Sequence, residues 1–173
     1  MEHSAYSHKC SIIVHKKVPI KLVILDCPSD EHIDEYINIL KDNNVHTVVR
    51  ICEKRFYNAA SFEKEGIRVI DDIKFEDGTT PDSKQVKLWR EIIEKEIKEY
   101  PSGETPAIAV HCVSGIGRAP VMVAITLIDY GIDSLDAVEF IRKYRRGAIN
   151  KKQLNWLSDS LKKKKKSFFK KLF

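Results

Sequence analysis

The sequence predicts an α/β fold: a single domain with a central mixed sheet that is rich in parallel strands and flanked by helices. Short aliphatic and β-branched runs of strand length alternate with longer segments whose apolar residues recur at helical spacing, as in a largely parallel sheet. The length of 173 residues suits one domain with a substantial core. No repeat or linker interrupts residues 1–160, so we expect one domain there and a polybasic C-terminal tail at residues 161–173.

The N-terminal part of the chain is expected to alternate between strands and helices. Aliphatic and β-branched runs predict strands at residues 10–15, 20–26, 45–51 and 67–70. A helix with Ser29 as its N-cap follows the second strand and ends at Asn43 and Asn44. A shorter helix at residues 60–64 ends at Gly66. The third strand is β-rich throughout, which suits a central strand covered on both faces.

The C-terminal part begins with a polar loop at residues 71–81, followed by an amphipathic helix that Asp82 caps. Residues 107–110 predict a buried strand, and residues 120–128 predict a helix that is apolar on almost every side. A further helix begins with Asp133 or Ser134 as its cap. Its predicted inward face comprises Leu135, Val138, Ile141 and Tyr144. Asn150 and Gln153 form a capping-box pattern for the last helix, which is expected to dock through Trp156, Leu157 and Leu161.

The positive charge of the chain is concentrated in its tail. Residues 161–173 contain seven lysines and no acidic residue, whereas residues 1–160 hold 23 basic and 25 acidic residues, a net charge of −2. The domain therefore has no excess of basic residues with which to bind nucleic acid, and we expect no such partner. The tail also contains Phe168, Phe169, Leu172 and Phe173, which predicts attraction to an anionic membrane surface; a disordered, solubilising tail is the alternative.

Cysteine usage and hydropathy predict where the protein acts. Four cysteines show no paired spacing and no signal peptide is recognisable, which favours a reducing cytosol in which a thiolate survives; they are Cys10, Cys27, Cys52 and Cys112. No apolar run approaches the length of a membrane span. We expect a cytoplasmic protein that associates peripherally with the inner face of membranes.

The stretch 107–130 carries the chemistry. A predicted strand leads into the loop HCVSGIGR, and a buried helix follows, an arrangement in which backbone N–H groups and the helix dipole bind an anion. The loop places Cys112 at its start and Arg118 at its end, where the guanidinium can grip two phosphate oxygens. The same positive charge favours the Cys112 thiolate, so the pattern predicts phosphoryl transfer through a phosphocysteine without metal or cofactor. The alternative is a buried cysteine in an ordinary turn. The predicted phosphate-binding residues are Val113, Ser114, Gly115, Ile116, Gly117 and Arg118.

At these residues the chain resembles the cysteine-dependent protein tyrosine phosphatases, whose signature is HC, five residues, then R. The longer string HCVSGIGRAPV, together with RRGAIN at residues 145–150 and VVRICE at residues 48–53, is similar to one branch, the phosphatases of regenerating liver. The resemblance runs from about Lys21 to Leu157. It implies a fold like that of the dual-specificity phosphatases and hydrolysis of phosphomonoesters. The substrate would be a phosphorylated protein, such as a phosphotyrosine protein, or a phosphoinositide.

Hydrolysis also requires an acid opposite Cys112 to protonate the leaving oxygen. The segment 71–82 offers five acidic residues, namely Asp71, Asp72, Glu76, Asp77 and Asp82. Asp82 suits a helix cap and the first two abut a strand, which leaves Glu76 and Asp77 in a segment free to move as a lid. The resemblance implies that Asp77 is the general acid, and a solvated loop carboxylate is the alternative. The family usually has Trp-Pro just before this segment, but here Ile73 and Lys74 stand there, so the lid lacks its usual aromatic anchor.

Two neighbours of the catalytic pair have roles implied by the resemblance. His111 helps to hold the loop and the thiolate, although a structural histidine is the default interpretation. Most tyrosine phosphatases have a hydroxyl residue after the arginine that assists breakdown of the phosphocysteine, whereas this chain has Ala119, so turnover should be slow. A slow enzyme could serve instead as a binding protein, as in relatives that grip an acidic loop of CBS-pair magnesium transporters. Arg145, Arg146 and Gly147 would border that interface.

Cys52 is the predicted redox partner of Cys112. Each cysteine follows a predicted strand, and if those strands are parallel neighbours, both sulfurs lie at the same edge of the sheet. Cys10 and Cys27 have no such placement. The resemblance supports the pairing, because the cysteine of the family's VVRIC segment is the partner in relatives. The alternative is that Cys52 is a small buried hydrophobe.

Overall fold

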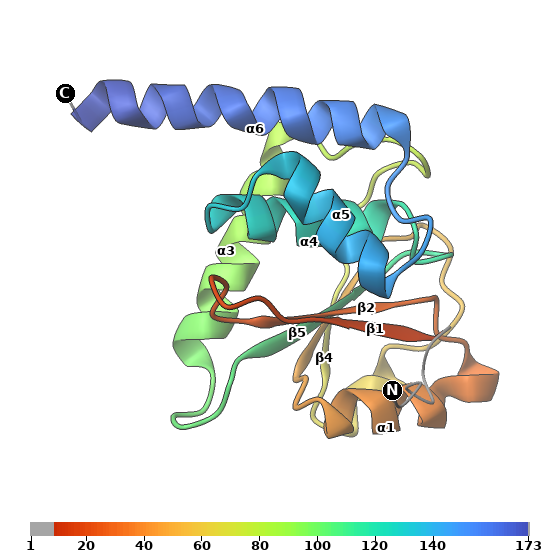
Figure 1. Ribbon diagram of the computed structural model, residues 1–173. Helices are drawn as coiled ribbons and strands as arrows, with labels where there is room; N and C mark the ends of the chain where they lie inside the picture. Colours follow the sequence, from red (N-terminus) through yellow and green to blue (C-terminus); the bar gives the residue numbers. More distant parts are fainter. Residues whose placement is uncertain (1–8, 173) are drawn as a thin grey trace.

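A computed structural model describes the backbone of residues 9–172 and the side chains of residues 9–161. It contains one five-stranded sheet with helices on both faces, so the predicted α/β fold with a mixed, parallel-rich sheet is confirmed (Figure 1). The side chains of residues 162–173, on which the predicted membrane attraction depends, lie outside the described part. No helix within the described residues is both long and apolar enough to cross a bilayer.

The sheet has the strand order β1-β2-β5-β3-β4. Its members are β1 (Cys10–Ile13), β2 (Lys21–Leu25), β3 (Thr47–Arg50), β4 (Arg68–Ile70) and β5 (Ala107–His111). Only the β1–β2 pair is antiparallel among these pairings, and β2, β5, β3 and β4 run parallel. Every residue of β3 and β5 is buried, because helices cover both faces of the central strands.

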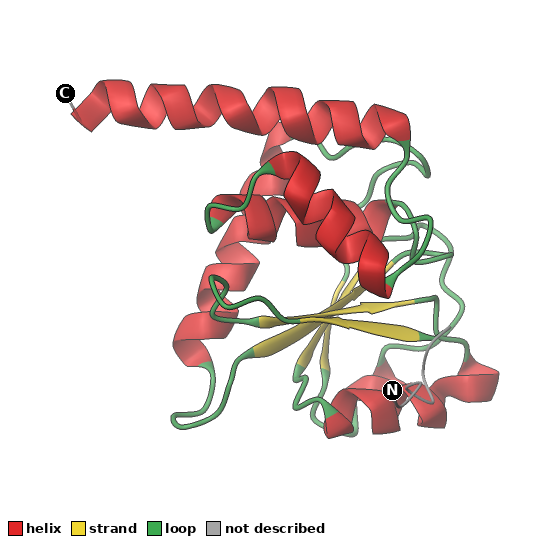
Figure 2. Cartoon of the chain, in the orientation of Figure 1, coloured by secondary structure: helices red, strands yellow, loops and turns green. Residues whose placement is uncertain are grey.

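The helices form two layers (Figures 1 and 2). One face carries α1 (Ile33–Asp42) and α2 (Ala60–Glu63), whose Leu40 and Phe62 pack with Val48 in one hydrophobic cluster. The larger cluster on the other face is formed with α3 (Ser83–Glu99), α4 (Arg118–Asp129), α5 (Ser134–Tyr144) and α6 (Lys151–Leu172). Both layers leave the carboxyl ends of the parallel strands available for a site.

Three predicted helix caps are observed. Asp82 caps α3 in a reciprocal capping box, Asp133 rather than Ser134 caps α5, and Asn150 and Gln153 exchange both capping bonds at the start of α6. The predicted cap at Ser29 is wrong. Residues Asp30–His32 form a 3₁₀ turn that bonds to the segment near Asn58, so α1 begins one turn later.

The predicted inward face of α5 is correct only in its middle. Val138 and Ile141 are buried, but Leu135 is 54% exposed and Tyr144 is 52% exposed. The buried residues of α5 are Ser134, Ala137, Val138 and Ile141, and Arg145 directly after the helix is also buried. These residues form one stripe along the helix, and Leu135 and Tyr144 lie outside it. At α6, Leu157 and Leu161 are buried and Trp156 packs against the core, as predicted.

Candidate active site

The loop predicted to bind phosphate lies at the carboxyl edge of the central strand. β5 ends at His111, α4 begins at Arg118, and β2 and β3 pair with β5 on either side. The Cys112 side chain is buried, with 1% of its surface exposed. Ala119 is buried in the first turn of α4. This position at the edge of a parallel sheet is where α/β proteins bind ligands.

Four consecutive carbonyl groups of this loop are hydrogen-bonded to groups outside it. The carbonyl of Val113 accepts from the backbone amide of Cys27 at 3.1 Å, and that of Ile116 from the amide of Ile149 at 2.7 Å. Between them, the carbonyls of Ser114 and Gly115 accept from one guanidinium, that of Arg145, at 3.4 and 2.6 Å. Among the described residues, no backbone carbonyl accepts from the amides of Val113, Ser114, Gly115 or Gly117. The loop therefore directs its carbonyls outward and keeps amide donors for an anion.

Arg145 is a buried support of the loop. Besides the two carbonyls, its Nη1 donates to Ser11 Oγ at 3.1 Å, and Ser11 Oγ donates to the Tyr144 carbonyl at 3.0 Å. Burial lowers the pKa of the Arg145 guanidinium. The prediction that this residue borders a partner interface is wrong for its side chain, because that side chain points into the protein. Arg146 is exposed.

The close contact between Arg145 and the loop requires a glycine at position 115. Its φ is +71°, and a Cβ built there would lie 2.4 Å from Arg145 Nη2 and 2.6 Å from the Leu25 carbonyl oxygen. Any side chain would therefore displace either the guanidinium or the backbone of β2. The absence of a side chain lets Arg145 approach the loop closely.

Arg118 is buried and only partly satisfied. Its Nη1 donates to the Phe75 carbonyl at 3.2 Å, while its Nε is buried and has no hydrogen-bond partner among the described residues. The nearest acidic atom reported for Nε is Asp77 Oδ1, at 3.8 Å. A buried guanidinium with a spare donor beside outward-turned carbonyls matches the requirements of a phosphate dianion.

The predicted lid lies against this arginine. Asp77 Oδ1 is 3.6 Å from the position of a Cβ on Gly117, and the Asp77 side chain is 77% exposed. The structure therefore places this carboxylate at the mouth of the site, beside the loop that begins with Cys112. Glu76 is exposed next to it, and its carbonyl accepts bonds from the amide and hydroxyl of Thr79.

The lid has anchors that the sequence interpretation missed. Asn150 Nδ2 donates to the Gly78 carbonyl and Gln153 Nε2 to the Thr79 carbonyl, both at 3.0 Å. Ile73 and Phe75 are buried in the larger hydrophobic cluster. Phe75 thus supplies an aromatic anchor two residues after the position where the family has tryptophan. The signal was present in the sequence, because a capping box made of two amides has spare N–H donors.

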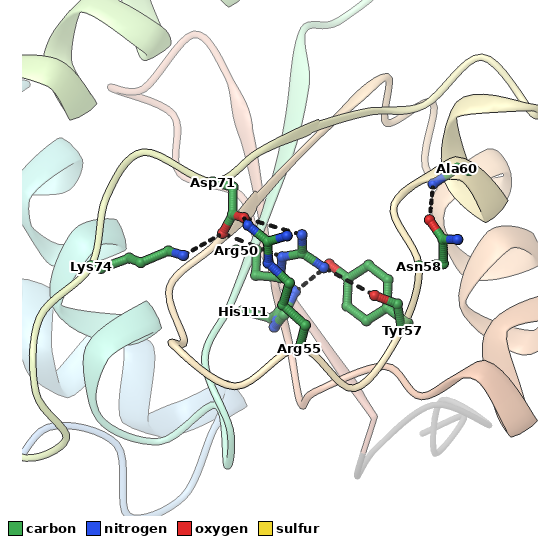
Figure 3. Close-up of polar contacts among 8 residues, drawn as sticks. All are labelled: Arg50, Arg55, Tyr57, Asn58, Ala60, Asp71, Lys74 and His111. Carbon is green, nitrogen blue, oxygen red and sulfur yellow. Dashed lines mark hydrogen bonds and ion pairs between the residues drawn. The ribbon is translucent and has the colours of Figure 1, made fainter.

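His111 is fully buried and both ring nitrogens are engaged. Nδ1 lies 3.0 Å from the Cys112 carbonyl and Nε2 lies 2.7 Å from the Tyr57 hydroxyl. Since a carbonyl can only accept, Nδ1 carries the proton and Nε2 accepts from Tyr57. Arg50 lies over the Tyr57 ring and pairs with Asp71, so this network leads from the catalytic loop to the base of the lid (Figure 3).

A second group of reactive side chains lies beside His111. The sulfurs of Cys27 and Cys52 and a ring nitrogen of His111 all lie within 4.8 Å of one another. The prediction that Cys27 lacks a placement like that of Cys52 is therefore wrong, because Cys27 follows β2, which is a parallel neighbour of β5 on the side opposite β3. The neighbouring Cys27 thiol lowers the pKa of Cys52 against the opposing effect of burial, and His111 and Arg118 act in the same direction as Cys27. The neighbouring Cys52 sulfur and burial raise the pKa of Cys27.

The class of protein that the fold and the loop geometry indicate is also the class of a matching family model. That model is described as "Polymorphic toxin system, DSP-PTPase phosphatase" and matches residues 12–132. Curated relatives narrow this class. PRL-1 phosphatase of Drosophila melanogaster is 49% identical over 138 residues, 80% of this chain and 76% of that protein. Human protein tyrosine phosphatase type IVA 3 is 42% identical over 138 residues, covering 80% and 77%. The chain belongs to the PRL, or type IVA, family of protein tyrosine phosphatases.

Solved structures agree with this assignment. A protein tyrosine phosphatase from Leishmania major is 35% identical, with a TM-score of 0.75 over 87% of this chain and 97% of that one. PTPMT1 in complex with PI(5)P has a TM-score of 0.70 at 20% identity, covering 88% and 97%, which shows a shared fold alone.

Proposed function

We propose that this protein tyrosine phosphatase hydrolyses phosphomonoesters through a phosphocysteine on Cys112. Arg118 binds the nonbridging phosphate oxygens and Asp77 is the general acid. One observation carries the proposal: within the described residues, the loop that begins at Cys112 keeps backbone amides without carbonyl partners, and the buried Nε of Arg118 has no hydrogen-bond partner. These donors match the charge that develops on a transferring phosphoryl group.

The reaction has two steps. The Cys112 thiolate attacks phosphorus, the bond to the leaving oxygen breaks, and the Asp77 proton passes to that oxygen. Water then attacks the phosphocysteine, Asp77 accepts its proton, and inorganic phosphate leaves as the thiolate is restored. Arg118 and the loop amides hold the phosphoryl oxygens in both steps.

The second step is expected to be slow. Ala119 lies buried directly after Arg118 and has no hydroxyl to assist the departing thiolate. Rapid mixing with an activated aryl phosphate should give a stoichiometric burst of phenol followed by slow turnover. Ala119→Ser should speed the slow phase at least about tenfold, and Cys112→Ser should abolish both phases. A wild type without a burst or phosphoenzyme would contradict the slow step, and full activity of Cys112→Ser would contradict the nucleophile.

We propose phosphotyrosine proteins as the substrates. The names of the curated relatives support this class, whereas the phosphoinositide bound to PTPMT1 belongs to a protein that shares only the fold. Phosphate release from a panel of phosphotyrosine peptides, phosphoserine peptides and phosphoinositides tests the choice. Faster release from phosphoinositides at equal concentration would transfer the assignment to lipids. The names of the relatives described above do not mention a magnesium transporter, so that partner stays a prediction from the resemblance.

We also propose that Cys52 protects the nucleophile. β3 and β5 are parallel neighbours, as the predicted pairing requires, and Cys27 and His111 favour the Cys52 thiolate. Peroxide oxidises Cys112 to a sulfenic acid, the Cys52 thiolate attacks that sulfur, and hydroxide leaves as the disulfide forms. The disulfide closes a loop of about 60 residues. Disulfide mapping after mild peroxide tests this, because a Cys52→Ser variant that recovers with thiol as fully as wild type would contradict it.

The remaining proposal concerns location. We propose that residues 162–173 bring the protein to anionic membranes, since each lysine near such a surface contributes about 1 kcal/mol. Because this attraction is electrostatic, it should weaken as the salt concentration rises. Sedimentation with phosphatidylserine vesicles at low salt should exceed that with neutral vesicles, and equal sedimentation would contradict the proposal.

A further inference from the structure

Three neighbouring parallel strands each deliver one metal-binding side chain to the same edge of the sheet. His111 ends β5, where its register partners are Leu25 of β2 and Arg50 of β3. Cys27 and Cys52 each follow two residues after those partners, so by strand parity both share the face on which His111 lies. This explains why the two sulfurs and the ring nitrogen converge within 4.8 Å.

We infer that Cys27, Cys52 and His111 form a binding site for a thiophilic divalent cation of the zinc class. Two thiolates and one imidazole are ligands that zinc prefers, and a three-residue set leaves its fourth position for water. Zinc–sulfur bonds of about 2.3 Å and zinc–nitrogen bonds of about 2.0 Å place tetrahedral ligands roughly 3.5–3.8 Å apart. Because the ligand atoms lie within 4.8 Å of one another, each pair needs a closing movement of about 1.3 Å at most.

The hydrogen bonds of His111 suit this role. Its Nδ1–H donates to the Cys112 carbonyl, which is the kind of outer contact that orients a metal-bound histidine. Its Nε2 lone pair accepts from Tyr57, so a cation takes Nε2 by displacing that hydroxyl (Figure 3). The tyrosine is therefore a competitor of the metal, and its removal should tighten binding.

The partial exposure of Cys27 gives the cation a path from solvent to the site. Cys27 is partly exposed, and its thiol also contacts the Pro28 carbonyl at 3.4 Å, whereas Cys52 and His111 are buried behind it. The cation meets Cys27 first and replaces the thiol protons, which pass to solvent. Cys27 is the ligand that makes the difference, because a set of only Cys52 and His111 has too few donors for a tight site.

Occupancy should switch the phosphatase off, a consequence that rests on the proposed function. The cation draws His111 away from Tyr57 while that histidine contacts the peptide of Cys112. It also occupies the Cys52 thiolate, so the Cys52–Cys112 disulfide no longer forms. Metal-loaded protein should therefore lose turnover and, under peroxide, oxidise at Cys112 beyond the disulfide stage.

Direct binding is the primary test, since it needs no turnover. The full-length protein, reduced and stripped with a chelator, is titrated with zinc against a chromophoric indicator and with cobalt by absorption. We expect one equivalent, with thiolate-to-cobalt charge transfer and the intense visible bands of tetrahedral cobalt. Cys27→Ser and Cys52→Ser should each weaken binding at least about tenfold, whereas Tyr57→Phe should strengthen it. Cys10→Ser replaces a buried cysteine of β1 and is the matched control.

Three outcomes would overturn the site. Wild-type affinity in Cys27→Ser would remove its distinguishing ligand, and loss of the cobalt bands in Cys112→Ser alone would move the metal to the catalytic cysteine. A Cys27–Cys52 disulfide by mass spectrometry, with no metal uptake after reduction, would assign the pair to redox chemistry. Zinc inhibition is measured for each variant against its own chelated rate. Binding without inhibition would refute only the switch, whereas absence of turnover in both the stripped and the metal-loaded wild type would refute only the proposed function.

Discussion

The catalytic loop and the lid are both held through their backbone carbonyls, but by different means. The loop carbonyls of Ser114 and Gly115 are fixed by the buried guanidinium of Arg145, with one bond of 2.6 Å. The lid carbonyls of Gly78 and Thr79 are held at 3.0 Å by neutral amides at the start of α6. Charged, buried bonds resist exchange with water, whereas neutral amide bonds near the surface exchange at little cost. We therefore expect the candidate phosphate loop to be the more rigid part and the segment that carries Asp77 to be the more easily displaced.

Removing the rigid support should have the largest effect. Arg145→Met leaves the buried carbonyls of Ser114 and Gly115 without a donor, which should lower the free energy of unfolding by about 2–4 kcal/mol. Turnover should fall with it, because the loop amides lose their orientation. Urea unfolding and aryl phosphate hydrolysis measure the two effects. Arg146→Met, at the exposed neighbour, is the control and should change neither. An Arg145→Met protein with normal stability would show that the loop does not depend on this guanidinium.

A side chain at Gly115, which would crowd the contact with Arg145, should reduce activity almost as much as the loss of Arg145. Gly115→Ala places a methyl group 2.4 Å from Arg145 Nη2 and 2.6 Å from the Leu25 carbonyl. The resulting shift of the loop should lower kcat/KM by about 100-fold. Gly66→Ala is the control, because Gly66 has a similar φ of +76° but nothing within 4 Å of its Cβ position. Equal loss of activity in both variants would assign the effect to backbone strain elsewhere, rather than to the close approach of Arg145.

A lid variant should alter activity while leaving stability nearly intact. Asn150→Asp keeps the oxygen that caps α6 but replaces the amide group that donates to Gly78. We expect kcat/KM to fall about tenfold, with a change in unfolding free energy below about 1 kcal/mol. Inhibition by inorganic phosphate should be unchanged, since the loop is untouched. Asn150→Ser, a good cap that is too short to reach the lid, should behave in the same way. Weaker phosphate inhibition would show that lid and loop are not separate parts.

A substitution of Asp71, at the base of the lid, should have the smallest effect of these changes, and that effect should depend on pH. Asp71 pairs with Arg50, Arg55 and Lys74 at 3.2, 2.9 and 3.3 Å. Burial raises the pKa of Asp71, but Arg50 and Lys74 outweigh it, so the pKa lies below its ordinary value. Its carboxylate therefore stabilises the fold above about pH 4, and this contribution is lost as the pH falls through the folded-state pKa.

Asp71→Asn should accordingly lower the free energy of unfolding by about 1 kcal/mol at neutral pH. The difference from wild type should shrink in acid, which urea titrations at several pH values would measure. Asp72→Asn changes the exposed neighbouring carboxylate and is the control. A difference that is constant with pH would show that the ionised carboxylate is not what stabilises the cluster.

Much of the fold could be predicted because apolar periodicity records burial. The buried runs that became β3 and β5, and the capping residues Asp82 and Asn150, act through their immediate neighbours in the sequence. The inward face of α5 was only half correct because a helix that packs through four positions leaves its apolar end residues, Leu135 and Tyr144, outside. The local sequence pattern does not show how many positions around the helix pack against the core.

The sequence pointed to the candidate site where one segment supplies its residues, and it missed the contacts that distant segments make there. Cys112, Gly115 and Arg118 share one loop, so their spacing was informative. Arg145 was interpreted as a surface cation, because only the approach of residues 30 positions earlier shows that it is buried. Cys27 was dismissed because its nearness to Cys52 depends on the strand order β2-β5-β3, which no local pattern encodes.

Helix α4 has no solvent-facing side over most of its length, since every residue from Arg118 to Ile128 is buried. The segment that aims a dipole at the phosphate is therefore also the centre of the hydrophobic core. Substitutions there cannot be sorted into those that adjust activity and those that adjust folding, because any change of volume acts on both. Evolution of this enzyme toward new substrates should consequently proceed through exposed positions beside the candidate site, such as Glu76, Lys151 and Lys152.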